Sequence, residues 1–250
     1  MKKIIISLSI IAAVAAIAIG GTVAYFSDTE TSTGNTFTAG AIDLTIDSNA
    51  TYNGDPVSAA TWGLKDLIPT ADKFFDFSDV KPGDQGENTI GLHVVSNDAY
   101  ACLYISPLVN NDNSCTEPEL AAEGGLTCGT DPNAGELAQN VQFFAWGDTD
   151  GDNIWEENEM PLFSNIKGPA SDVLNGKTYN LGTIAGGATK YLGVQWCAGD
   201  MTVDLTNRTI TCGGTAMGNN CQSDSMVGSI AFYVEQQRNN PGFVCPTSPF

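Results

Sequence analysis

Basic residues and histidine are scarce in this 250-residue sequence. It has 10 Lys and Arg against 29 Asp and Glu, and a single histidine. Without residues 1–24, which hold two lysines and no acid, 8 basic residues would face 29 acidic ones, a net charge of −21. A surface this acidic repels phosphate and attracts divalent cations. We therefore expect no nucleic-acid partner.

The usual catalytic motifs are also missing. One histidine, His93, cannot build an H-E-x-x-H motif or a multi-histidine zinc site within one chain, and its alternating surroundings suggest an ordinary strand residue. There is no G-x-S-x-G elbow, P-loop or dinucleotide fingerprint. A carboxylate pair of the glycosidase type stays open, although carboxylates are weak evidence in so acidic a chain. We expect no enzyme and name no catalytic residue.

Cysteines are absent from the first third of the chain and frequent afterwards. They stand in Gly/Asn/Thr-rich surroundings without C-x-x-C pairs, which favours disulfides over free thiols or a metal site. Cys197 and Cys212 are the closest candidate pair, because the stretch 201–211 between them can turn back as a hairpin and bring their Cα atoms within roughly 7 Å. An odd count leaves at least one cysteine over or bonded to another chain. The candidates are Cys102, Cys115, Cys128, Cys197, Cys212, Cys221 and Cys245.

The N-terminus has the layout of a secretory signal peptide. The charged start MKK precedes the apolar run 4–19 and a small-residue end at 20–24. We predict cleavage between Ala24 and Tyr25. A signal peptidase is then a partner during export, and the chain contacts the membrane only transiently, through its signal peptide. The mature protein would be secreted, either extracellular or at the cell surface. The alternative is a retained anchor, since the run approaches the roughly 20 residues that span a bilayer.

Motifs at this junction and further along resemble one protein family. They are the glycine-rich end of the apolar run, the sequence AYFSD at 24–28, residues 35–44 with Ile42-Asp43-Leu44 at their end, and the turn KPGD at 81–84. They are similar to the TasA/camelysin family over roughly residues 1–46 and 76–106. The resemblance implies export through a SipW-type signal peptidase and, as in the best-known members, assembly into extracellular biofilm fibres. Camelysin's peptidase label makes a secreted metallopeptidase the enzymatic alternative.

Short segments with period-two alternation recur along the chain. Ile42, Leu44 and Ile46 alternate with polar residues, and the same pattern returns at 90–94, 103–105, 192–196 and 230–234. Gly/Asn/Asp/Pro turns separate these segments, and nothing suggests a βαβ repeat. We expect an all-β protein, an antiparallel jelly-roll-like β-sandwich with short helical and loop insertions.

The expected organisation is a signal peptide at 1–24, an N-terminal arm at 25–40 and a single sandwich domain at 41–250. Insertions are expected at about 48–72, 107–140 and 147–175, with short helices at 117–123, 135–139 and 170–174. The KPGD sequence is typical of a β-turn, because proline presets φ at the second position and glycine accepts a positive φ at the third. It predicts a hairpin or a sheet-crossing corner.

The polar, Thr/Ser-rich arm allows two interpretations. It is either a disordered or edge-lying tail, or a strand that inserts into a neighbouring subunit, since backbone pairing at a sheet edge needs little side-chain match. The second interpretation makes this chain a structural subunit of an extracellular filament, matrix fibre or surface layer. Its partners would be further copies of itself and other matrix components. A monomeric surface adhesin is a third, weaker interpretation.

Residues 148–159 follow the twelve-residue D-x-D-x-D…E calcium loop. Three aspartates two residues apart and a closing glutamate supply the oxygens that Ca²⁺ needs, and asparagine at the sixth position tolerates a left-handed conformation. We expect a structural Ca²⁺ in a loop between β-elements, because 141–146 before it resembles a strand. An acidic surface turn without a ligand is the alternative. The expected ligands are Asp148, Asp150, Asp152 and Glu159 by side chain, Ile154 by its carbonyl and Glu156 through water.

Two N-x-T triplets, at Asn49 and Asn207, are candidate glycosylation sites if the host modifies exported proteins. Such triplets arise often by chance, so they carry little weight on their own.

Overall fold

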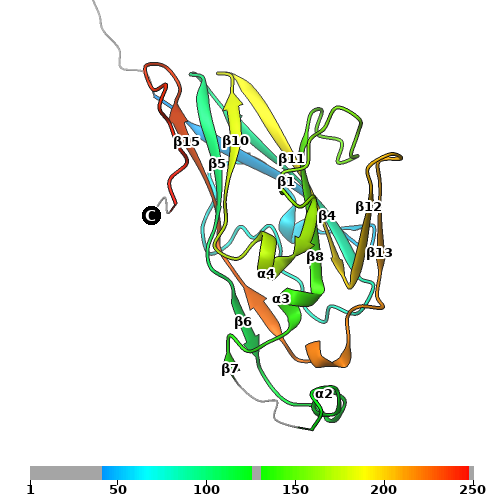
Figure 1. Ribbon diagram of the computed structural model, residues 1–250. Helices are drawn as coiled ribbons and strands as arrows, with labels where there is room; N and C mark the ends of the chain where they lie inside the picture. Colours follow the sequence, from blue (N-terminus) through cyan, green and yellow to red (C-terminus); the bar gives the residue numbers. More distant parts are fainter. Residues whose placement is uncertain (1–40, 126–130, 248–250) are drawn as a thin grey trace, which may run out of the picture. The chain divides into compact units, whose positions relative to one another are not determined.

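The computed structural model describes residues 41–125 and 131–247 (Figure 1). Its larger sheet, here called sheet I, has seven strands in the order β2-β1-β4-β11-β8-β9, with β3 also paired to β1. Every pairing in it is antiparallel. Its strands are β1 (Leu44–Tyr52), β2 (Asp55–Pro56), β3 (Trp62–Lys65), β4 (Gln85–Val94), β8 (Val141–Asp148), β9 (Lys167–Pro169) and β11 (Ala188–Ala198).

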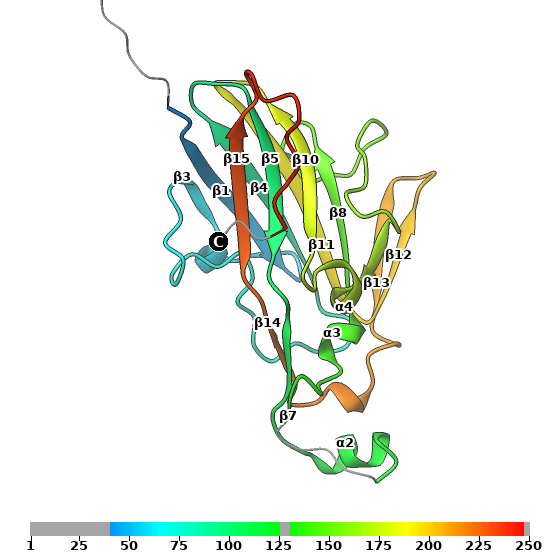
Figure 2. The ribbon, with the colours of Figure 1, turned by 60° about the vertical axis from the view of Figure 1, so that its left-hand side comes forward.

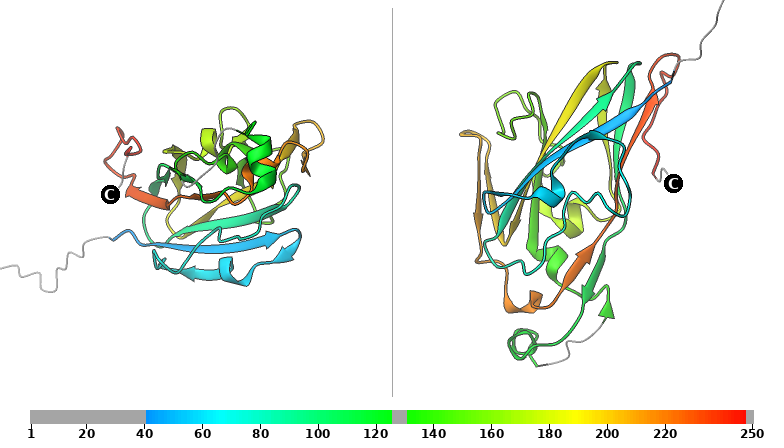
Figure 3. Two further views of the ribbon diagram at one scale, coloured as in Figure 1. Left: turned by 90° about the horizontal axis from the view of Figure 1, so that it is seen from below. Right: turned by 180° about the vertical axis from the view of Figure 1, so that it is seen from behind.

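A second sheet, here called sheet II, packs against sheet I (Figure 3). It has the antiparallel order β10-β5-β15. Its strands are β10 (Thr178–Ile184), β5 (Ala99–Ile105) and β15 (Ile230–Gln236). The chain passes from β4 in sheet I to β5 in sheet II, and from β10 back to β11. Because β4 pairs with β11 and β5 with β10, one antiparallel ribbon wraps across both sheets, which is a jelly-roll arrangement.

The main core lies between the two sheets. Ile46 of β1 stands opposite Leu92 of β4 in register, and Ala101 and Leu103 of β5 face them from sheet II. These side chains are buried, while the residues between them point outward. Period-two alternation thus places one face of each strand in the core, as the sequence pattern predicts.

Sheet I is covered on its outer side as well, at β8 and β11. Phe143 and Ala145 face the interior, whereas Phe144 and Trp146 alternate with them and are buried on the opposite face. A hairpin lies over this outer apolar set (Figure 2). It consists of β12 (Asp200–Asp204) and β13 (Thr209–Gly213). An apolar run on both faces of β8 is therefore explained by a third layer.

The remaining elements are short, and most of them lie at one end of the sandwich (Figure 1). The helices are where the sequence places them, and α2 begins with a capping box between Thr116 and Glu119. No helix within the described residues combines the length and apolarity needed to cross a bilayer. The elements are β6 (Val109–Asp112), β7 (Asp131–Pro132), β14 (Ser225–Val227), α2 (Glu117–Ala122), α3 (Leu137–Asn140), α4 (Ala170–Val173), η1 (Ser58–Ala60) and η2 (Asn219–Cys221).

The expected fold class, an all-β antiparallel sandwich, is confirmed. The expected insertion at 48–72 is wrong in its first part, because β1 continues to Tyr52 and Ser48 and Ala50 are buried in it. Ser48 is hidden despite its polarity because its hydroxyl donates to the carbonyl of Ala60 at 2.8 Å. Strands β2 and β3 pair with β1, so much of this segment forms a sheet edge.

Candidate functional site

The acidic loop follows directly from the buried strand β8. Asp148 is the last residue of β8 and is 4% exposed. Its carboxylate accepts backbone N–H bonds from Gly151 at 2.7 Å and Asn153 at 3.0 Å. Asn153 has a φ of 61°, the left-handed conformation expected at the sixth loop position. The loop therefore turns tightly around the first of its predicted ligands.

Three of the predicted ligands lie together. One oxygen from each of Asp148, Asp150 and Asp152 lies within 4.8 Å of the other two. Glu156 beside them is exposed, and the charge of Asp150, followed by burial and the remaining loop acids, raises its pKa. The loop thus concentrates negative charge and hard oxygen donors, which is the donor chemistry that suits Ca²⁺.

The other predicted ligands are arranged differently. Glu159 is 1% exposed, and its two oxygens accept the N–H groups of Thr149 at 2.6 Å and Glu156 at 3.0 Å. It therefore closes the loop through backbone bonds and lies outside the group of three aspartates. The N–H of Ile154 donates to Asp152 Oδ1 at 2.7 Å, and the Ile154 side chain is exposed. Asp148 and Glu159 thus stand at the first and twelfth positions of the calcium-loop pattern, where they close the loop from both ends.

Two contacts that the sequence pattern does not reveal tie this loop to the sandwich. Glu87 of β4 accepts a bond from Asn153 Nδ2 at 3.3 Å, and burial raises its pKa although that bond opposes the shift. Arg208, next to the β12–β13 turn, stacks over Trp155 with 4.5 Å to the ring centroid. Because Trp155 is buried beside Phe144, the loop and the hairpin pack together against the outer face of β8.

A second acidic group joins distant segments. Carboxylate oxygens of Asp112, Glu119 and Asp224 lie within 4.8 Å of one another. Burial, then the charge of Asp224 and neighbouring acids, raises the pKa of Glu136 to about 7. The sequence gives no sign of this group because its members are separated by other elements, and the contacts supply no independent indication of a ligand.

Five of the six cysteines in the described residues are disulfide-bonded. The expected bond between Cys197 and Cys212 is present, with its Cα atoms 5.5 Å apart, and Cys102 bonds to Cys245 across a sequence separation of 143. Cys115 is also disulfide-bonded, whereas Cys128 lies outside the described residues. Cys221 is a buried free thiol, and burial followed by nearby carboxylates raises its pKa to about 12. It is thus the cysteine left over.

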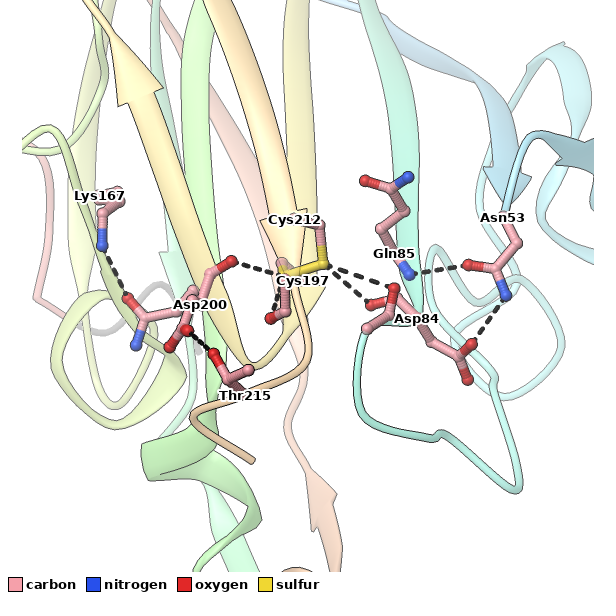
Figure 4. Close-up of a disulfide and its surroundings, with 11 residues drawn as sticks. Asn53, Asp84, Gln85, Lys167, Cys197, Asp200, Cys212 and Thr215 are labelled. Carbon is pink, nitrogen blue, oxygen red and sulfur yellow. Dashed lines mark hydrogen bonds between the residues drawn. A yellow bond between two sulfur atoms is a disulfide. The ribbon is translucent and has the colours of Figure 1, made fainter. Parts of the chain in front are cut away.

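The KPGD turn lies beside the Cys197–Cys212 bond, as Figure 4 shows. Asp84 accepts bonds from Tyr52 Oη at 2.5 Å, Asn53 Nδ2 at 2.8 Å and the N–H of Lys81 at 2.7 Å. Burial raises the pKa of Asp84, but these bonds outweigh it and hold the pKa below the ordinary value. The motif is a turn that joins β1, β4 and the hairpin.

The single histidine lies on β4, where its Nδ1 is 2.9 Å from Thr189 Oγ1. Of the glycosylation triplets, Asn49 is exposed on β1. Asn207 is exposed at the hairpin turn, where its Nδ2 donates to Asp204 Oδ2 at 2.7 Å. The predicted cleavage site at Ala24 and Tyr25, and the arm 25–40, lie outside the described residues.

Sheet II ends in two edges of different character. Strand β10 has a bulge at Leu181, where Gly182 donates to Asn180 Oδ1 and the Leu181 carbonyl accepts Lys190 Nζ at 2.7 Å. Strand β15 pairs only with β5 within the described residues. Its inward side chains Ile230, Phe232 and Val234 pack on the core yet are only partly buried.

Residues 1–95 match the family model described as camelysin metallo-endopeptidase. The match confirms the resemblance to the TasA/camelysin family over the N-terminal part of the chain, through the end of β4. The acidic loop and all seven cysteines lie beyond it. No curated protein matches the chain.

Proposed function

Residues 1–95 of this chain carry the camelysin family pattern, and from this premise we propose that the mature protein is a structural subunit of an extracellular filament or matrix fibre. Each subunit completes sheet II of a neighbour with its N-terminal arm, residues 25–40. The signal peptide directs the protein to the cell exterior and is removed by cleavage between Ala24 and Tyr25. Cleavage frees the arm only after export, so that subunits do not assemble inside the cell.

The incomplete edge at β15 is the observation that carries this proposal. Ser229 and Gln237, on either side of β15, both bond to the β5 side of the sheet. Because the hydrogen-bonding direction alternates along a strand, residues 230, 232 and 234 point their backbone groups away from β5. The same residues point their side chains into the core, where they are only partly buried. An added strand would satisfy these backbone groups and complete the burial.

The opposite edge of sheet II is unsuited to the same role. A bulge bends β10, and Lys190 reaches between the sheets to bond the Leu181 carbonyl. Bulges and inward-pointing charges are the means by which natural sheets prevent edge pairing. With one accepting edge and one arm, each subunit binds one neighbour ahead and one behind. Such head-to-tail contacts do not close on themselves, so that the product is a fibre.

The arm has the composition that this interaction needs. Its backbone can pair along the edge, and Phe26 and Phe37 are the candidate anchors for the partly open core. Burying one large apolar side chain contributes roughly 1.5 to 3 kcal/mol. Two anchors together with a backbone ladder are therefore enough to hold subunits together.

We assign the acidic loop a structural Ca²⁺, held by Asp148, Asp150 and Asp152 with Glu159 closing the loop. The ion would offset the repulsion among these carboxylates and fix the layer formed by the loop and the hairpin. The family description names a metallo-endopeptidase, but the single histidine of this chain does not supply a zinc-peptidase motif. This favours a structural role over a catalytic one.

One backbone substitution at the acceptor edge tests the proposal. Val234→Pro removes an N–H that points away from β5, while Val234→Ala keeps that N–H and serves as the matched control. We expect the mature Ala variant to form fibres under negative-stain microscopy and the Pro variant to stay monomeric with an unchanged circular dichroism spectrum. Abundant fibres from Val234→Pro would show that β15 is not the accepting edge.

A further inference from the structure

Residues 237–247 form a strap over sheet II. After β15 the chain turns, with the N–H of Asn240 donating to the carbonyl of Gln237, and then runs back beside the sheet (Figure 2). Asn240 Nδ2 donates to Glu235 Oε1 at 2.7 Å, which fixes the start of the return. The strap therefore begins directly at the end of the proposed acceptor strand.

Two kinds of contact fasten the strap to the outer face of sheet II. Phe243 stacks on Tyr100 of β5, with centroids 4.8 Å apart, and lies parallel to Tyr233 of β15 at 6.4 Å. Cys245 then bonds to Cys102 on β5, which stands opposite Tyr233 in register. The strap thus crosses from the edge strand to the central strand and is covalently held there.

Strand β15 needs such a support. It has one pairing partner within the described residues, and its inward side chains are only partly buried. Edge elements with few buried contacts open at lower free energy than the rest of a domain. The bond between Cys102 and Cys245 closes a loop that contains β15, and disulfides that close long loops restrict the unfolded chain most.

We propose that the strap is a latch that holds β15 in place to accept a neighbour's arm, so that closing the Cys102–Cys245 bond makes a subunit competent to assemble. This inference rests on the proposed fibre function. The bond forms when the two thiols lose two protons and two electrons to a disulfide oxidant, which is reduced to a dithiol. Such oxidants act outside the reducing cytosol. Oxidation would then add a second condition for assembly to the cleavage that frees the arm.

The test compares three oxidised forms of the mature chain, residues 25–250. They are the wild type, Cys102→Ser/Cys245→Ser, and the control Cys197→Ser/Cys212→Ser, which removes a bond near the KPGD turn. Amide hydrogen exchange is measured over β15 and β8 at concentrations below fibre formation, and fibre elongation is followed at higher concentrations by light scattering. Protected β8 amides show that each variant is folded.

We expect the Cys102/Cys245 variant to exchange its β15 amides at least about tenfold faster than wild type, with β8 unchanged and fibre elongation lost. The control should retain wild-type β15 protection. Phe243→Ala, which keeps the bond, should show a smaller increase in β15 exchange and slower elongation.

Two results would refute the latch, and they differ in whether they also refute the proposed fibre function. Wild-type exchange at β15 and wild-type elongation in the Cys102/Cys245 variant would refute the latch and leave the fibre function standing. Absence of fibres in all forms, wild type included, would refute the proposed function and with it the role of the strap in assembly.

Discussion

Calcium should stabilise the folded protein through the acidic loop, and removing two carboxylates should abolish the effect. The perturbation is Asp148→Ala/Asp150→Ala, with the milder Asp150→Asn beside it. Asp148 accepts backbone N–H bonds from Gly151 and Asn153, so the double variant loses stability without calcium as well. The informative quantity is therefore the rise in melting temperature that calcium causes within each variant.

The size of that rise follows from mass action. A ligand that binds only the folded state at 100 times its dissociation constant adds about 2.7 kcal/mol to the free energy of unfolding. For a chain of this size, about 1 kcal/mol corresponds to a shift of roughly 2 to 4 °C, so the expected rise is about 5 to 11 °C. Within the described residues, the other group of three carboxylates this close together is Asp112, Glu119 and Asp224, which the double variant leaves intact.

Differential scanning calorimetry with and without calcium measures the rise. Asp55→Ala/Asp66→Ala removes the same charge from exposed positions and is the matched control, because a general charge effect would be reduced equally there. Magnesium should act weakly, since it demands a smaller and stricter geometry. An unchanged calcium response in Asp148→Ala/Asp150→Ala would refute the assignment of the ion to this loop.

Three further outcomes follow from individual contacts. Asp84→Asn should lower the free energy of unfolding by about 1 to 2 kcal/mol at pH 7 in urea titrations. Because the folded pKa of Asp84 lies below the unfolded value of 3.8, this difference should begin to shrink near pH 3.8 and be lost at pH values below the folded pKa. An equal loss at both pH values would contradict the ionic role of Asp84. Gly193→Ala should destabilise by about 1 to 3 kcal/mol, because its Cβ would meet the buried Trp146 ring, and a neutral result in the same titration would show that the ring can move. Cys221 should resist thiol reagents at pH 8 until the protein unfolds, as its pKa is raised to about 12, and rapid labelling in the native state would refute its burial.

Local pattern predicted the strands and the fold class because each strand buries one face. Alternation at 90–94, 103–105 and 230–234 corresponds to β4, β5 and β15 in the structure. The hairpin between Cys197 and Cys212 was predictable for the same reason, since both cysteines flank a local turn. These features depend on residues that are close in sequence.

Features that depend on distant residues were not predictable. Ser48 has a polar side chain, and its hydroxyl is satisfied inside β1 by the Ala60 carbonyl and by Asn88 Oδ1, residues 12 and 40 positions away. The bond between Cys102 and Cys245 joins segments 143 residues apart, and many pairings of seven cysteines satisfy the sequence equally well. In the acidic loop, spacing indicated the three aspartates, but Glu87 reaches the loop from β4 and Arg208 from the β12–β13 turn.

If the arm of one subunit completes sheet II of the next, deletion of residues 25–40 should prevent fibre formation. Mature chains covering residues 25–250 and 41–250 are compared by negative-stain microscopy and by sedimentation under identical conditions. We expect fibres from the longer chain and a folded monomer from the shorter one, with the same circular dichroism spectrum for the sandwich. Fibres formed by residues 41–250 alone would contradict it.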